Sequence, residues 1–171
     1  SEYFGTGKNP RKLGSAHPRN APYQAYRAAD GWFAIAAGND KLWRSVCDVV
    51  GAPQWPADSR FATTTLRAEN QTALKDLLEA RFAGANASEW LTRFRAAGVP
   101  CAPIHGYAEA LADPQARSLG LVLPLTLPGG HATRTVGCPI HLDGGPVAVD
   151  TTLPALGEHT AALRATVKAM P

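Results

Sequence analysis

Two polar segments of this chain hold the residue types best suited to chemistry, and the first is the loop Gly14–Gln24. His17, Arg19 and Asn20 lie in this loop together with two prolines. Arg19 is able to meet a phosphate or a carboxylate, and the prolines stiffen the loop and lower the entropy cost of holding it closed. The same composition fits a solvated linker that enters a sheet. A ligand-binding wall and a linker are therefore the two interpretations of this loop.

The second polar segment is Gly38-Asn39-Asp40, which directly precedes a helical pattern of apolar residues. Asn39 or Asp40 is thus predicted to cap a helix. Unpaired N–H groups at a helix N-terminus also favour anions, which makes substrate binding the alternative to a plain cap. Further along, Glu158-His159-Thr160 opens another predicted helix, either as a cap or as an acid–base pair.

Other classes of site are disfavoured by the sequence. The five histidines lack the spacing of metal ligands, and no phosphate-binding glycine loop is present. The three cysteines are odd in number, which predicts reduced thiols and a cytoplasmic protein. A formal net charge of +3 does not favour nucleic acid as a partner. No apolar stretch approaches the roughly 18 residues of a membrane span, so a membrane partner is not expected either.

These segments must be positioned by a folded domain, since 45% of the 171 residues are hydrophobic and 18% are charged. Apolar runs at Tyr23–Ala28 and Trp32–Ala37 flank Asp30-Gly31, which is a strong hairpin signal. The further elements that the patterns predict are helices from Asn39 or Asp40 to Gly51, from about Arg67 to Phe82, from Asn86 to Gly98, from Asp113 to near Gly120 and over Leu156–Ala169, an edge strand at Val99–Ile104, and a second hairpin of Leu121–Leu127 and Thr133–Leu142. Ser1–Ala21, Pro53–Thr65 and Gly144–Pro154 are predicted to be irregular.

The order of hairpin, helices, hairpin and helix predicts an α+β fold in which a small antiparallel sheet packs with helices. We expect the tryptophans to lie in the core and not to form a stacking platform. On the last helix, Leu163 and Val167 are expected to point inward. Cys101, between prolines, is expected to be a small buried residue.

Several stretches resemble one family when their order and spacing are taken together. They are Thr6-Gly7-Lys8, His17-Pro18, Ala21-Pro22-Tyr23-Gln24, Asp30-Gly31, Ala37-Gly38-Asn39-Asp40, Asp58-Ser59-Arg60-Phe61, Arg67-Ala68-Glu69-Asn70, Glu89-Trp90-Leu91, Ala97-Gly98-Val99-Pro100-Cys101-Ala102-Pro103-Ile104, Asp113-Pro114-Gln115, Pro139-Ile140 and Leu156-Gly157-Glu158-His159-Thr160. Over nearly its whole length the chain resembles the second half of a class III CoA-transferase, of the CaiB/BaiF family.

This resemblance implies an enzyme that moves CoA from an acyl-CoA donor to a small carboxylic acid, by covalent catalysis at an aspartate. It also implies that this aspartate lies in a Rossmann-like large domain, which the chain is expected to lack. Residues 1–22 would then be a linker and active-site loop, residues 23–142 the small domain, and residues 143–171 a segment that returns to the large domain. The chain alone is expected to be inactive, and the full-length protein to be an interlocked homodimer. CoA thioester is the expected substrate, without a tightly bound cofactor.

The residues that the resemblance places near the acyl substrate, or near the partner's aspartate, are His17, Asn20, Tyr23 and Asn39. The matching loop of formyl-CoA transferases is rich in glycine, whereas residues 17–23 contain none, so a stiffer loop is expected here. Related racemases tend to carry a glutamate where Asn39 stands, and an amide cannot exchange a proton at neutral pH. A racemase or dehydratase of the same family, and a non-catalytic dimerisation or interaction module, are the alternatives.

Overall fold

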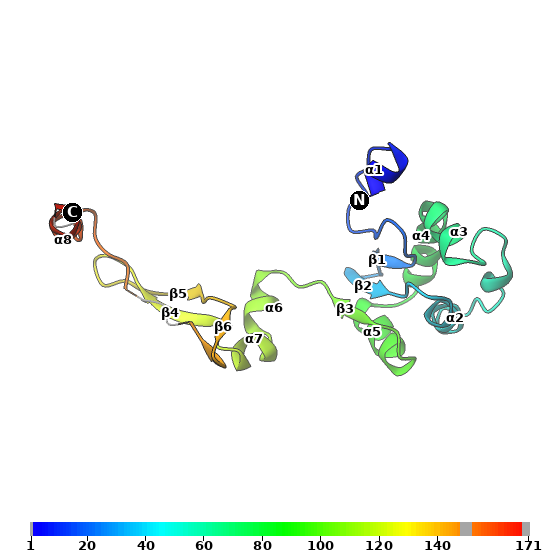
Figure 1. The fold of residues 1–171 in the computed structure, drawn as a ribbon. Helices are drawn as coiled ribbons and strands as arrows, with labels where there is room; N and C mark the ends of the chain where they lie inside the picture. The colour runs from blue at the N-terminus through cyan, green and yellow to red at the C-terminus, as the bar shows by residue number, and fades with distance from the viewer. Residues whose placement is uncertain (1, 148–151, 169–171) are drawn as a thin grey trace. The chain divides into compact units, whose positions relative to one another are not determined.

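The computed structural model describes residues 2–147 and 152–168, which form two compact units, residues 1–104 and 105–171 (Figure 1). Each unit is described by itself. The elements of the first unit are α1 Glu2–Thr6, β1 Tyr23–Arg27, β2 Trp32–Ala36, α2 Asp40–Val49, the 3-10 turn η1 Trp55–Ala57, α3 Thr64–Glu69, α4 Gln71–Phe82, α5 Ala87–Ala96 and β3 Cys101–Pro103. The predicted division at residues 22 and 142 stays a prediction.

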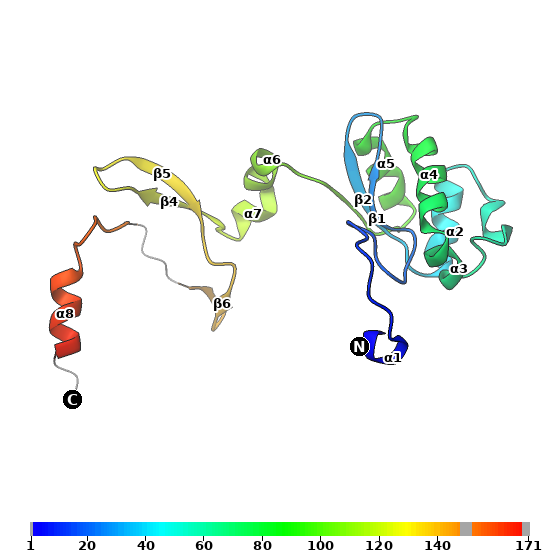
Figure 2. The ribbon, with the colours of Figure 1, turned by 90° about the horizontal axis from the view of Figure 1, so that it is seen from above.

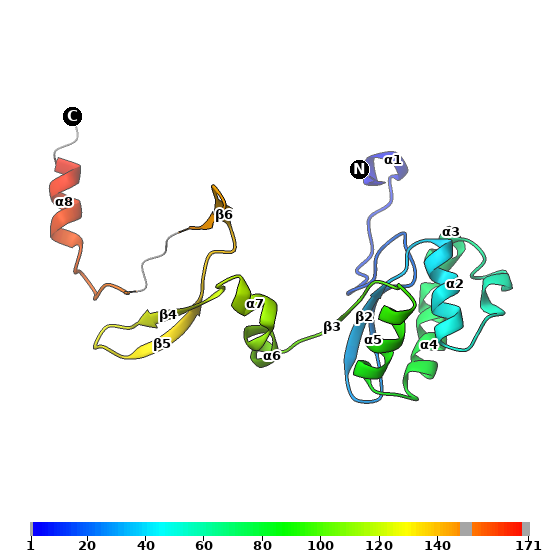
Figure 3. The ribbon, with the colours of Figure 1, turned by 90° about the horizontal axis from the view of Figure 1, so that it is seen from below.

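An antiparallel sheet in the order β1-β2-β3 forms one layer of the first unit. Ala25 lies opposite Ala34 across the predicted hairpin, and Ala34 lies opposite Ala102 of the edge strand β3. Because side chains alternate along a strand, Tyr26 and Phe33 point to the other face and are buried. Helices α2, α4 and α5 lie on one side of the sheet (Figures 2 and 3). The predicted α+β fold is confirmed.

The core between the sheet and the helices is built around one aromatic side chain, that of Phe82 near the end of α4. Its ring centroid lies 5.0–5.9 Å from those of Tyr26, Phe33, Trp90 and Phe94, with edge-on geometry in each pair. All five side chains are at most 5% exposed. Such edge-to-face pairs stabilise beyond the area that they bury, so this cluster fixes the helices against the sheet.

The prediction that the tryptophans form the core is correct only in part. Trp43 and Trp90 are buried, and Trp55 is half-buried and stacks on Trp43 at 6.3 Å between ring centroids. Trp32 is 46% exposed, which contradicts the prediction. The reason is the strand alternation, because Trp32 shares the outer face of β2 with Ala34. Cys101 is half-buried, with its thiol 3.7 Å from the Leu91 carbonyl oxygen.

Two predictions for the first unit are wrong in detail. The helix expected from Arg67 to Phe82 is divided into α3 and α4, because Thr63 caps an earlier start and the Asn70 side chain donates to the Leu66 carbonyl at 2.9 Å. The segment expected to be irregular up to Ala21 contains the short helix α1. The predicted start of α5 at Asn86, with Glu89 in a capping box, is confirmed.

The described part of the second unit holds short elements. They are α6 Tyr107–Ala112, α7 Pro114–Ser118, β4 Val122–Thr126, β5 Ala132–Val136, β6 His141–Leu142, β7 Gly145–Pro146 and α8 Thr160–Lys168. The predicted hairpin is confirmed as β4 and β5, and Asp113 caps α7 as predicted by accepting the Gln115 N–H.

Three differences from the sequence-based expectation occur in this unit. Helix α6 was not predicted, and the expected strand Thr133–Leu142 is interrupted, with its end pairing as β6 with β7. Helix α8 begins later than expected, at Thr160. Leu163 and Val167 are 64% and 68% exposed, because nothing described in this unit covers that face of the helix. Ser1, residues 148–151 of the predicted loop Gly144–Pro154, and Ala169 of the predicted helix lie outside the described residues.

Candidate functional site

The loop of residues 14–22 is closed by hydrogen bonds around one histidine. Nδ1 of His17 accepts the backbone N–H groups of Arg19 at 3.1 Å and Asn20 at 3.0 Å. The backbone N–H of His17 donates to the carbonyl oxygen of Tyr23 at 2.9 Å. The imidazole also stacks on the Tyr23 ring, with 5.2 Å between centroids and 17° between planes. The structure therefore brings two of the predicted site residues into direct contact.

Side chains on either side hold the same loop to the rest of the first unit. The hydroxyl of Ser15 accepts the N–H of Ala25, which lies on the free edge of β1, at 3.1 Å. The side-chain amide of Gln71, at the start of α4, donates to the carbonyl oxygen of His17 at 3.1 Å. The loop is thus an ordered part of the fold, which favours a wall over a solvated linker.

A third predicted residue, Asn20, lies against the second polar segment. The N–H of Ala37 donates to the carbonyl oxygen of Pro22 at 2.8 Å, which joins the loop to the end of β2. A Cβ atom placed on Gly38 would lie only 3.1 Å from the Cβ of Asn20. A side chain at position 38 would press on Asn20, so glycine favours the close approach of the two segments. The loop and the residue before Asn39 are therefore in contact.

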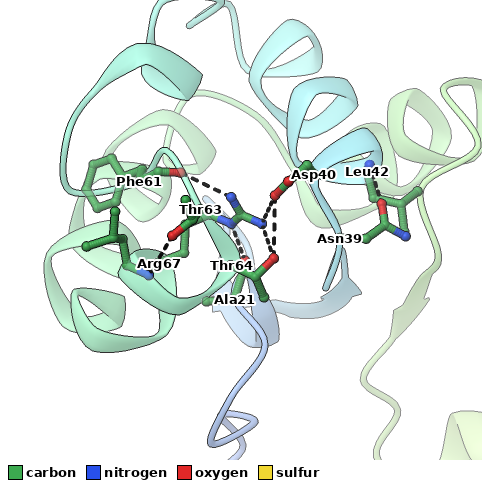
Figure 4. A network of polar contacts seen from close by, with 9 residues as sticks. Ala21, Asn39, Asp40, Leu42, Phe61, Thr63, Thr64 and Arg67 are labelled. Atoms are coloured by element: carbon green, nitrogen blue, oxygen red, sulfur yellow. Dashed lines mark hydrogen bonds and ion pairs between the residues drawn. The ribbon is translucent and has the colours of Figure 1, made fainter.

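Asn39 is the N-cap of α2, as the capping interpretation predicted. Its Oδ1 accepts the backbone N–H of Leu42 at 2.9 Å (Figure 4). The side chain is exposed, and its NH₂ group is a second, separate hydrogen-bonding group. Ligand binding by Asn39 stays a prediction. The cap uses Oδ1 alone, so the NH₂ group remains able to donate to a ligand.

The chemistry of these groups is that of neutral hydrogen-bond donors. Because Nδ1 of His17 accepts two N–H groups, the proton of the neutral imidazole is on Nε2, which can donate to a ligand. The Tyr23 hydroxyl and the amides of Asn20 and Asn39 are further donors. Donors of this kind suit carboxylate and carbonyl oxygens, and none of these groups is a carboxylate nucleophile.

An apolar hollow of about 470 Å³ adjoins Tyr23, which is the member of this donor set that lines it. Tyr23 lines it together with small residues of the outer sheet face, among them Ala25, Ala34 and Ala36. The Tyr23 side chain is 44% exposed. The hollow can take an apolar group next to Tyr23, because its lining offers few polar atoms of its own.

Arg67 is the residue of this region to which the sequence analysis gave no role. Its guanidinium is fully buried and donates to the carbonyl of Ala21 at 2.8 Å and to Oδ1 of Asp40 at 2.8 Å (Figure 4). This hydrogen bond and the charge of Arg67 hold the pKa of Asp40 below its ordinary value. A signal was present in the sequence, because Arg67 stands seven residues before the apolar residue Leu74, which is the spacing of one face in the helix predicted there.

Glu158, the acid of the predicted acid–base pair, belongs to the second unit and precedes α8. Its carboxylate accepts the backbone N–H of Ala155 at 2.6 Å. Among residues 2–147 and 152–168, no group of three or more His, Cys, Asp or Glu side chains is placed to hold a metal ion. None of the helices in these ranges is long and apolar enough to cross a membrane.

Known proteins are similar to this chain over nearly its whole length. The family model described as "CoA-transferase family III" matches residues 1–160. The succinate–glutarate CoA-transferase of Agrobacterium fabrum is 32% identical over 93% of this chain and 40% of its own length. The acetyl-CoA:oxalate CoA-transferase of Acetobacter aceti is 39% identical over 69% of this chain and 30% of its own.

Solved structures agree with this likeness. A CAIB/BAIF family protein from Brucella suis superposes with a TM-score of 0.75 and is 35% identical, over 97% of this chain and 43% of its own. The chain thus spans less than half the length of the relatives that it matches.

Proposed function

The chain belongs to CoA-transferase family III, and we propose that it is one wall of the active site of an acyl-CoA:carboxylate CoA-transferase. The rest of the enzyme would correspond to the parts of its relatives that this chain does not match. In this proposal an aspartate outside the chain attacks the thioester carbonyl, and the CoA thiolate leaves. Enzyme anhydride and enzyme thioester intermediates then carry CoA to the acceptor acid.

The observation that carries this proposal is the family match over residues 1–160, together with the donor set around His17. Carboxylic acids and thioesters present oxygens that accept hydrogen bonds, and His17, Asn20, Tyr23 and Asn39 offer neutral donors. The apolar hollow beside Tyr23 fits the non-polar part of a thioester. The relatives are named for succinate, glutarate and oxalate, so a small dicarboxylate is the proposed acceptor.

The proposal includes a homodimer in which the large domain of one protomer faces the small domain of its partner. The nucleophile then reaches the His17 loop from another part of the assembly. On this basis the 171-residue chain alone does not catalyse CoA transfer.

The test is a CoA-exchange assay of a longer protein that contains this chain and a large domain. Succinyl-CoA is the donor, and succinate, glutarate and oxalate are the acceptors, each followed by liquid chromatography of the CoA thioesters. We expect exchange by the longer protein and none by the 171-residue chain. Exchange by the chain alone would show that the nucleophile lies within it.

A second measurement addresses the racemase alternative. The longer protein is incubated with a 2-methylacyl-CoA in deuterated water, and deuterium at the α-carbon is measured by mass spectrometry. We expect no incorporation, because Asn39 cannot remove a proton at neutral pH. Deuterium incorporation without acid exchange would replace the transferase proposal by the racemase.

A further inference from the structure

A buried guanidinium connects both segments of the candidate site. The Arg67 side chain is fully buried, and a buried charge is stable only when it is paired and hydrogen-bonded. Its Nε donates to the Ala21 carbonyl, and its Nη2 donates to Oδ1 of Asp40. Ala21 lies in the loop of residues 14–22, and Asp40 follows Asn39. One planar group therefore spans from the loop to the N-terminus of α2.

The remaining contacts of Arg67 fix its position. Nη1 donates to the Phe61 carbonyl at 3.1 Å, and Nη2 also donates to Oγ1 of Thr64 at 3.0 Å. The guanidinium carbon lies 5.7 Å from the centroid of the Trp43 ring, which belongs to α2. These partners come from separate segments, and only a rigid fork of several donors reaches them together. A lysine ammonium, which is a point charge, cannot do so.

We propose that Arg67 is a positioning residue of the CoA-transfer site, which sets the loop of residues 14–22 at a fixed place relative to Asn39. Arg67 acts through the Ala21 carbonyl on one side and through Asp40 on the other, without contact with substrate. The kinetic part of this inference rests on the proposed function, whereas the effect on loop order does not.

The test compares Arg67→Lys with Arg60→Lys. Arg60 is a matched control because it lies nearby in sequence and pairs with Asp58 at 2.7 Å, but its side chain is 51% exposed. Amide hydrogen exchange of His17, Arg19 and Asn20 is measured by NMR in each purified chain. We expect exchange on the order of tenfold faster in R67K, because the charged hydrogen bond to the Ala21 carbonyl is lost, and unchanged in R60K.

The same two variants in the longer protein give the kinetic readout. We expect R67K to raise the KM of the acceptor acid and lower kcat, with R60K like the wild type. Asp40→Asn is the second variant if R67K does not fold. Asparagine keeps an oxygen at the Oδ1 position that accepts from Arg67, and it removes the negative charge. It is expected to accelerate loop exchange by a smaller factor than R67K.

Each outcome decides a separate statement. Loop exchange equal in R67K, D40N and wild type overturns the positioning role. Faster loop exchange in R67K with unchanged kcat and KM would show that Arg67 orders the loop. It would overturn the role of the loop in CoA transfer. If the wild-type longer protein transfers no CoA, the proposed function fails, and the exchange data still decide whether Arg67 orders the loop.

Discussion

Replacing Asn39 separates its structural role from its proposed contact with substrate. In Asn39→Ala the Leu42 N–H loses the side-chain acceptor that lies 2.9 Å away. Loss of an N-cap of this type costs about 1 kcal/mol of unfolding free energy. For a domain of roughly 100 residues this lowers Tm by about 4–8 °C. Thermal unfolding followed by near-UV circular dichroism measures the change, since Trp43 lies in the capped helix.

Asn39→Ser is the control, because serine caps a helix as well as asparagine does but lacks the NH₂ group. We expect the Tm of N39S to stay within about 2 °C of wild type, which corresponds to a few tenths of a kcal/mol. In the CoA-exchange assay of the longer protein, the loss of one donor should raise the acid KM about threefold to tenfold. Wild-type kinetics in N39S would refute a substrate contact and leave Asn39 as a cap alone.

Three further predictions follow from burial and charge. Because its pKa is lowered, the ionised Asp40 contributes stability above about pH 4, and this contribution is lost as the pH falls through the lowered pKa. Between pH 7 and pH 3, the free energy of unfolding measured with urea should therefore fall less in D40N than in wild type. Phe82→Ala should lower the free energy of unfolding, measured with urea, by about 3–5 kcal/mol, because Phe82 is the centre of the aromatic core. A decrease of less than about 1 kcal/mol would contradict that packing. Burial raises the pKa of the Cys47 thiol to about 12, so a thiol reagent at pH 8 should modify the half-buried Cys138 first and Cys47 only after denaturation.

Elements with local signals were predicted from the sequence with little error. Asn39, Asn86 and Asp113 each cap a helix as expected, because a cap depends on contacts within three residues along the chain. The division of the helix at Asn70 was missed, since its side chain competes with the backbone for the Leu66 carbonyl. Trp32 was placed wrongly, because burial on a strand depends on which face the helices cover.

The candidate site is less predictable because long-range contacts order it. The prolines of the loop suggested stiffness, but its order comes from His17, from Gln71 more than fifty residues away, and from Arg67. Apolar periodicity identifies the face on which Arg67 lies and does not identify the carbonyl that it meets. A charged residue on an apolar helical face indicates that a partner exists without naming it.

The structure also changes the question that the sequence posed for Asn39. A helix cap and a substrate contact are alternatives when one side chain is considered as a single unit. In the structure the cap uses Oδ1 alone, and the exposed NH₂ group is a separate donor. The two roles therefore require different atoms, and capping restricts the orientation of the side-chain amide. Capping is thus a reason to expect a well-placed ligand contact, because a donor that is already ordered loses less entropy on binding.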